Sequence, residues 1–219
     1  MIDRINFVKN KIRNLKNPKD YSFIPRLPVK GESLLMLRPL PDKLIKESKN
    51  DALLMAKWRK IHLESFSTVF QPTEAGTKKW LKHNYFNNYE DIIFFIETND
   101  KIPFGHVSLY NFNRNECEFG RVIKGFNVGP KGSMAIASME VINWGFNSLK
   151  LNKIYLEVFA DNERAVNLYF KLGFSLVKKI PCILIDIENK KMWVETNQKH
   201  DLDNSDIRIK YLMEIKSKD

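Results

Sequence analysis

The sequence predicts one α/β (α+β) domain built on a central mixed, mostly antiparallel sheet that is flanked by helices. Three observations predict it. Residues 91–124 read as three successive strands joined by short polar turns, a glycine-rich loop at 125–133 opens a helix, and residues 153–187 read as strand, helix and strand. Short turns join antiparallel strands, whereas a strand–helix–strand unit places two strands in one sheet with a helix on its face.

The strand–helix–strand unit has the strongest pattern. Residues 153–159, KIYLEVF, alternate with a period of two and are rich in β-branched and aromatic side chains. Asn162 can cap the helix that follows, and Gly173 can end it in the left-handed conformation. The apolar side chains of this helix share one face and are Ala165, Leu168, Tyr169 and Leu172.

The same stretch carries a motif. Asn162, Arg164, Ala165, Tyr169 and the pair Gly173-Phe174 form the pattern N-x-R-A-x-x-x-Y-x-x-x-G-F. It resembles the second conserved motif of the GNAT family of N-acetyltransferases. The alternative is an ordinary amphipathic helix in which Tyr169 is a core aromatic, but few such helices combine all of these residues. The resemblance extends over about residues 31–216, and it implies the GNAT fold with a β-bulge or splay in the cofactor strand.

The loop before the 134–149 helix is the expected site for the CoA pyrophosphate. A glycine-rich turn that opens a helix presents backbone N–H groups and the positive end of the helix dipole to an anion. The loop departs from the family pattern, because Gly129 replaces a Gln or Arg and Met134 replaces a Gly or Ala. The expected cofactor-binding residues here are Gly129, Lys131, Gly132, Ser133 and Met134.

The resemblance also implies how the rest of acetyl-CoA binds and reacts. Backbone groups of Val122 and Ile123 pair with the pantetheine arm, and Asn162 and Ala165 fix it. Tyr169 is the expected acid for the departing thiolate. No metal site is expected, since the four histidines lack metal-ligand spacing.

Three side chains are candidates for the base that removes the proton from the acceptor amine. Glu118 is the first choice, because it lies on the strand before the cofactor loop, and Glu116 replaces it if the register differs by two residues. His106, after Gly105 on the preceding strand, is the third. The alternatives are exposed strand carboxylates and a structural histidine.

The acceptor is expected to be a small molecule with a primary amine. The segments around Trp58-Arg59, 73–80 and Gly105-His106 resemble a GNAT subgroup that acetylates nucleotide-linked amino sugars in surface-glycan pathways. The alternatives are acetylation of protein N-termini, including ribosomal ones, and a non-catalytic CoA-binding module.

The net charge of +10 is unevenly distributed. Residues 1–30 contain eight Lys/Arg and two Asp/Glu, which predicts a basic helical arm and linker before a GNAT domain at 31–219. A basic amphipathic helix can lie on an anionic membrane or contact a protein. The narrow apolar stripe without Trp instead favours packing on the main domain or on a neighbouring subunit of a homodimer. A nucleic-acid partner is not expected, because the rest of the chain is only mildly basic.

The remaining expectations are local. Strands are expected at 33–40, 175–187 and 207–215, helices at 51–70 and 78–85, and a polar connection at 188–206 that contains Trp193 and His200. Cys117 and Cys182 are expected to be buried thiols. The N-terminus lacks the apolar core of a signal peptide, and no apolar run approaches ~20 residues. These features predict a cytoplasmic protein.

Overall fold

A computed structural model describes residues 2–20, 24–30, 34–187, 190–196 and 207–217. The helices are α1 (Ile2–Lys16), α2 (Asp51–Ile61), α3 (Glu74–Trp80), α4 (Ser133–Asn147) and α5 (Glu163–Lys171), with a 3-10 turn at Leu63–Ser65 and a π-helical turn at Leu81–Tyr85. The strands are β1 (Leu27–Pro28), β2 (Leu35–Pro39), β3 (Thr68–Val69), β4 (Asp91–Thr98), β5 (Pro103–Asn113), β6 (Glu116–Lys124), β7 (Lys153–Phe159), β8 (Ser175–Ile187), β9 (Lys190–Glu195) and β10 (Ile207–Lys216).

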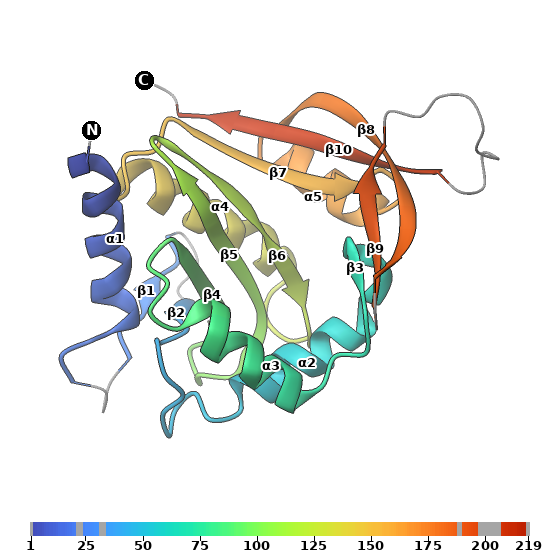
Figure 1. The fold of residues 1–219 in the computed structure, drawn as a ribbon. Helices are drawn as coiled ribbons and strands as arrows, with labels where there is room; N and C mark the ends of the chain where they lie inside the picture. Colours follow the sequence, from blue (N-terminus) through green and yellow to red (C-terminus); the bar gives the residue numbers. More distant parts are fainter. Residues whose placement is uncertain (1, 21–23, 31–33, 188–189, 197–206, 218–219) are drawn as a thin grey trace.

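All ten strands form one sheet in the order β1-β2-β4-β5-β6-β7-β10-β8-β9-β3 (Figure 1). Among the strands of the described residues, only β6 and β7 pair in parallel, and the other pairs are antiparallel. The predicted mixed, mostly antiparallel sheet is therefore confirmed. Helix α4 makes the β6-to-β7 crossover, which a parallel pair requires.

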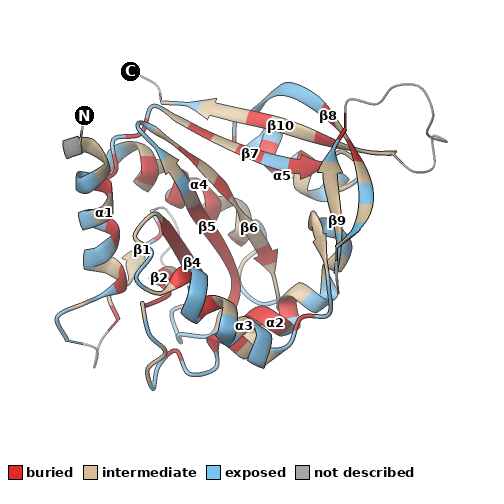
Figure 2. Cartoon of the chain, viewed as in Figure 1, coloured by how far each residue is buried: buried red, intermediate tan, exposed pale blue. Residues whose placement is uncertain are grey.

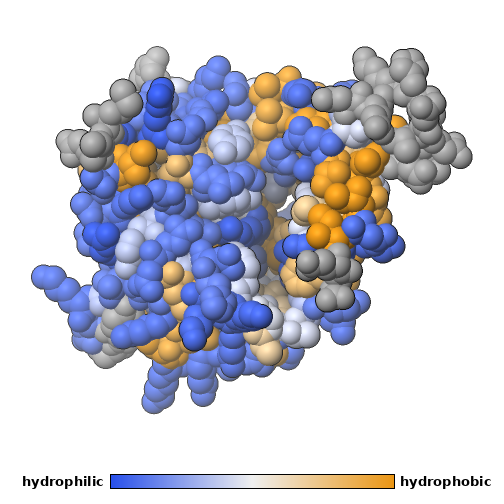
Figure 3. Space-filling view, in the orientation of Figure 1, coloured by the Kyte–Doolittle hydropathy of each residue, from blue (hydrophilic) through white to orange (hydrophobic). Residues whose placement is uncertain are grey.

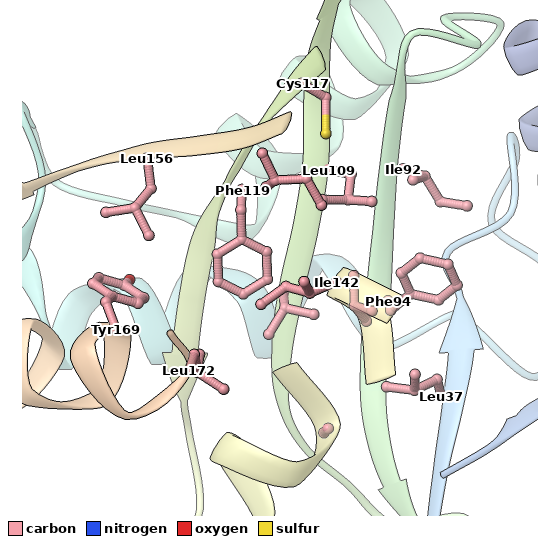
Figure 4. Close-up of a cluster of buried hydrophobic side chains, with 14 of the residues drawn as sticks. Leu37, Ile92, Phe94, Leu109, Cys117, Phe119, Ile142, Leu156, Tyr169 and Leu172 are labelled. Carbon is pink, nitrogen blue, oxygen red and sulfur yellow. The ribbon is translucent and has the colours of Figure 1, made fainter. Parts of the chain in front are cut away.

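Each face of the sheet has its own core. On β4, Ile92 and Phe94 belong to the core that also contains α4 and α5, whereas Ile93 and Phe95 pack against α2 and the π-helical turn. Strand β4 is buried on both faces, as its apolar run predicts, and it is almost entirely red in Figure 2. Figure 4 shows the first core, in which Phe119, Leu109 and Ile142 meet.

The N-terminal helix α1 packs on the main domain. Its Val8 and Ile12 are buried in the α4–α5 core. Packing on the domain was the interpretation that its narrow apolar stripe favoured. In the part of the chain that the structure describes, no helix has the length and apolar composition that crossing a membrane requires.

The C-terminal region contains one strand more than predicted. The connection expected at 188–206 includes β9, which pairs with β8 and, through Thr68 and Val69, with β3. Trp193 lies on β9, and its ring meets Phe159 on β7 edge-on. His200 lies outside the described residues. Cys117 and Cys182 are buried free thiols, as predicted.

Candidate active site

Strands β6 and β7 separate soon after they meet. They pair only between Glu116–Glu118 and Lys153–Tyr155, and β7 then continues along β10 on its other edge. Figure 1 shows the two strands diverging, and the space-filling view in Figure 3 is hollowed between the β4–β6 part and the β8–β9 part. The splay in the cofactor strand, which the sequence predicts, is confirmed. A strand edge that faces such a gap can pair with an extended ligand.

A bulge in β6 shapes the wall of this gap. His106 pairs with Ile123 and Ser108 with Gly120, so β6 has one residue more than β5 in this interval. Arg121 takes up the extra length with a left-handed φ of 50°. As a result the side chain of Arg121, like that of Ile123, lies on the α2–α3 side of the sheet, whereas Val122 packs toward α4.

The turn before α4 is built around two glycines with positive φ. Gly129 has φ 83° and Gly132 has φ 87°. Gly132 caps the 15-residue helix α4, and a Cβ there would meet nothing within 4 Å. The first turn of α4 is thus open to an anion, and the residues present fit a phosphate group.

Two residues predicted for this turn have other local roles. The hydroxyl of Ser133 donates to the carbonyl of Pro130, its N–H bonds to the same carbonyl, and the residue is buried. The side chain of Met134 packs on the core beside Gly105. Lys131 is exposed at the same turn, so the backbone and this cation are what the turn offers to a phosphate.

Helix α5 begins and ends as its motif predicts. The Oδ1 of Asn162 accepts from the N–H of Ala165 at 3.3 Å, which leaves the amide Nδ2 to donate to a ligand. Tyr169 is buried, with its ring edge-on to Phe119 on β6 and 6.0 Å from the ring of Phe174. Figure 4 shows this ring between α5 and the two strands that separate. Burial raises the pKa of Tyr169, so the phenol keeps its proton.

Glu118 lies where the two strands begin to separate. Its Oε1 accepts from the phenol of Tyr110 at 2.6 Å and its Oε2 from Asn111 Nδ2 at 2.8 Å. Its neighbours Cys117 and Phe119 point into the opposite core. Its alternative, Glu116, forms an ion pair of 2.6 Å with Lys153 at the far end of the paired segment. Glu118 is thus the carboxylate nearer to the gap.

His106 is buried on the same side of the sheet. Its ring contacts Trp58 and Phe95, it hydrogen-bonds to the backbone of Arg121, and its Nδ1 has no partner among the described groups. Nε2 is therefore the atom that bonds to Arg121, which leaves Nδ1 with a free lone pair. Burial lowers the pKa of His106 to about 4, so the ring is neutral at neutral pH.

The lowered pKa of His106 predicts acid sensitivity. Between pH 4 and its ordinary value near ~6.5, the unfolded chain binds a proton that the folded chain does not, so stability falls as the pH is lowered through this window. We expect this group to remove ~2 kcal/mol of unfolding free energy between pH 7 and pH 5. Urea unfolding at both values should show a smaller loss in His106→Gln than in wild type, and an unchanged loss in His83→Gln, whose side chain is exposed. An equal loss in all three proteins would contradict the expectation.

Two arginines complete this wall, and the sequence analysis assigned neither of them a role. Arg121 lies 4.1 Å from the ring of Tyr110 and 5.2 Å from that of Trp80. Arg59 on α2 lies 4.0 Å from the ring of Phe66 and 4.7 Å from that of Phe70. Burial and then the charge of Arg121 lower the pKa of Arg59 to about 10. The wall therefore combines two neighbouring guanidinium groups with four aromatic rings.

Helix α2 packs directly against the end of β6. Trp58 is buried against Gly125, and a Cβ at that glycine would overlap its indole. His62 Nε2 lies 3.1 Å from the carbonyl of Lys124. Helix α2 and the residue that follows it thus contact the end of β6 and the loop after it.

Comparisons with known proteins agree with this geometry. A family model described as an acetyltransferase (GNAT) domain matches residues 35–175. The acetyltransferase PseH of Campylobacter jejuni is 31% identical over 83 residues, which are 38% of this chain and 51% of PseH. The match thus spans about half the length of that relative. The spermidine N(1)-acetyltransferase of Escherichia coli K12 is 29% identical over 145 residues, which are 64% of this chain and 72% of that protein.

Solved structures share the fold. A chimera of the spermidine N-acetyltransferase SpeG from Vibrio cholerae and hSSAT has a TM-score of 0.60 and 22% identity, and the match covers 84% of this chain and 96% of that chain. Campylobacter jejuni PseH, solved in complex with acetyl coenzyme A, has a TM-score of 0.53 and 21% identity, and covers 84% and 100%. The family model spans more than half of the sequence and coincides with the splayed strands and the α4 turn. The chain therefore belongs to the GNAT family of acetyltransferases.

Proposed function

We propose that this acetyltransferase moves the acetyl group of acetyl-CoA to the primary amine of a nucleotide-linked amino sugar. The observation that carries the choice of acceptor is the pair of guanidinium groups, Arg59 and Arg121, among aromatic rings beside the splay. One relative, PseH, and one group of relatives that act on spermidine stand at similar distance in sequence. The relatives alone therefore do not determine the acceptor.

The charges of the wall favour the anionic acceptor. Burial, and then the charge of Arg121, lowers the pKa of Arg59, whereas the pKa of Arg121 is raised, because its burial is outweighed by the carboxylate of Asp91. Arg59 is thus the less compensated of the two cations, and its buried Nε has no hydrogen-bond partner among the described groups. A diphosphate accepts paired hydrogen bonds from guanidinium groups and would compensate the charge of Arg59. A polycation such as spermidine would be repelled by Arg59. Aromatic rings next to the arginines offer stacking surfaces for a base.

The chemistry requires one bond to form and one to break. Acetyl-CoA supplies an acetyl thioester, whose C–S bond breaks as the amine nitrogen forms the new C–N bond. The proton of the amine goes to Glu118, or through water to the Nδ1 of His106, and Tyr169 protonates the thiolate. A backbone N–H of Val122 or Ile123 would polarise the thioester oxygen.

The remaining predicted residues would hold the cosubstrate. The free amide Nδ2 of Asn162 can donate to the pantetheine arm beside Ala165. The turn at Gly129 and Gly132, with Lys131, would hold the pyrophosphate at the start of α4. The fit rests on the open position above Gly132 and on the unpaired edge of β6.

A thiol-release assay with acetyl-CoA and three acceptors tests the proposal. The acceptors are a UDP- or dTDP-linked amino sugar, spermidine, and a peptide with a free N-terminus. We expect kcat/KM to be roughly 100-fold higher for the nucleotide sugar than for spermidine. Arg121→Gln should raise KM for the nucleotide sugar and leave acetyl-CoA binding, measured by calorimetry, unchanged.

Three outcomes would oppose the proposal. Preference for spermidine would contradict the charge argument, and preference for the peptide would favour protein N-terminal acetylation. Acetyl-CoA binding without transfer to any amine would indicate a non-catalytic CoA-binding module.

A further inference from the structure

One basic stripe of α1 faces the main domain, and its last residue is buried. Lys9 pairs with Glu90 at 2.7 Å, the guanidinium of Arg13 lies 4.6 Å from the ring of Tyr89, and Lys16 follows on the same face. These positions recur every three to four residues, so they form one stripe of the helix. The stripe contacts the connection between the π-helical turn and β4. Helix α1 thus contacts the residues that lead directly into β4, which begins at Asp91.

Lys16 enters a socket made of backbone carbonyls. Its Nζ donates to the carbonyls of Tyr85 at 2.7 Å, Asn88 at 2.7 Å and Asp91 at 3.1 Å, and lies 3.5 Å from the centre of the Tyr85 ring. The three donors of the ammonium match three acceptors. The residue is 0% exposed. Burial lowers the pKa of Lys16 to about 7 in spite of these bonds, so the side chain is held in a defined geometry although its burial is unfavourable for the charge.

One of the residues that bind Lys16 also binds Arg121, which lies in the wall of the candidate acceptor site. Asp91, whose carbonyl accepts from Lys16, is 4% exposed, and its Oδ1 accepts from Arg121 Nη1 at 2.6 Å. Arg121 in turn lies over Tyr110 and Trp80. Lys16, Asp91 and Arg121 therefore form an unbroken series of contacts from the N-terminal helix to the β6 bulge.

We propose that Lys16 is a positioning residue for acceptor binding, which fixes Asp91 and through it the orientation of Arg121. The N-terminal helix thereby becomes part of the acceptor site without touching the acceptor. The alternative is that Lys16 only anchors the loop at 85–91 and stabilises the fold. The two alternatives differ in whether the replacement of Lys16 changes the hydrogen exchange of β6.

Hydrogen exchange of the full chain separates these alternatives and needs no acceptor. In Lys16→Met we expect faster exchange at 85–91 and also at 120–123 on β6, with no change in α5. The matched control is Lys11→Met, an exposed lysine of the same helix that lies over the ring of Phe7 and should change neither segment when replaced. Faster exchange at 85–91 alone would overturn the proposal, because the effect would then stop at the loop.

Kinetics give a second test, which rests on the proposed acceptor. Lys16→Met should raise KM for the nucleotide sugar about tenfold while kcat and the Kd of acetyl-CoA stay within about twofold, the pattern of lost acceptor binding. In an Asp91→Asn background the same substitution should add little, because both act through one carboxylate. Additive effects would overturn the proposal.

The test remains decisive if Lys16→Met does not fold. Asp91→Asn keeps the carbonyl that Lys16 uses and removes only the carboxylate that holds Arg121. It should show the same exchange change at 120–123 with 85–91 unaltered, and unchanged exchange at β6 would overturn the proposal. If exchange behaves as expected and no nucleotide sugar reacts, the proposed acceptor is wrong and the positioning role stands.

Discussion

Replacing Tyr169 by Phe is expected to lower kcat roughly 100-fold or more, the usual contribution of a positioned proton donor. The substitution removes only the phenolic oxygen. The ring keeps its contacts with Phe119 and Phe174, so the fold and the Kd of acetyl-CoA should be unchanged. Steady-state thiol release and calorimetric titration of acetyl-CoA measure the two quantities.

The pH dependence of this effect strengthens the test. Burial raises the pKa of Tyr169, so wild type should not lose activity through this phenol in the alkaline range up to its ordinary value near ~10. Tyr211→Phe is the matched control, since Tyr211 on β10 is half-buried and packs on the same core. If Tyr169→Phe retains more than about a third of wild-type kcat, the acid is another group.

Replacing Arg38 by Met is expected to have the largest effect on stability. Arg38 on β2 is 1% exposed and binds both oxygens of Asp51 at 2.9 Å, and it also pairs with Glu97. Removing it leaves a buried carboxylate of Asp51 without a counter-charge. We expect a loss of about 3–5 kcal/mol in the free energy of unfolding, measured in urea.

A surface ion pair provides the comparison for Arg38. Lys78 and Glu74 pair at 2.6 Å on the exposed face of α3. Lys78→Met should cost less than about 0.5 kcal/mol. Similar losses of unfolding free energy in Arg38→Met and Lys78→Met would mean that burial does not determine how much these ion pairs contribute to stability.

The elements with local patterns were predicted well from the sequence. The alternation in 153–159, the Asn162 cap and the Gly173 stop are properties of neighbouring residues, and the structure has β7, α5 and β8 there. Strand β9 was missed because its sequence, KKMWVE, begins with two lysines, although it forms a hairpin with the preceding β8, and because its other partner, β3, is distant in sequence. The position of β10 between β7 and β8 likewise depends on pairing that no local pattern records.

The wall of the site was harder to predict for the same reason. Glu118 was identified by its place on a strand, but its contacts with Tyr110 and Asn111 cross the β5–β6 hairpin. Strict alternation puts Arg121 on the same face as the core residue Phe119. Only the extra residue in β6 brings it to the other side. The sequence signal for such a bulge is weak, because Arg is not a residue that favours positive φ.

The bulge also limits how this strand can vary in length. Before it, even-numbered residues such as Glu118 and Gly120 face the acceptor side, and after it odd-numbered ones such as Arg121 and Ile123 do. Deleting Gly120 or Arg121 would restore strict alternation and leave the facing of the other positions unchanged, but it would remove one of the two successive positions that the bulge directs to the acceptor side. A one-residue deletion elsewhere in β6 would instead reverse the facing of the positions between the deletion and the end of the strand or the bulge. The extra residue of β6 therefore provides the additional position from which the guanidinium of Arg121 reaches the carboxylate of Asp91.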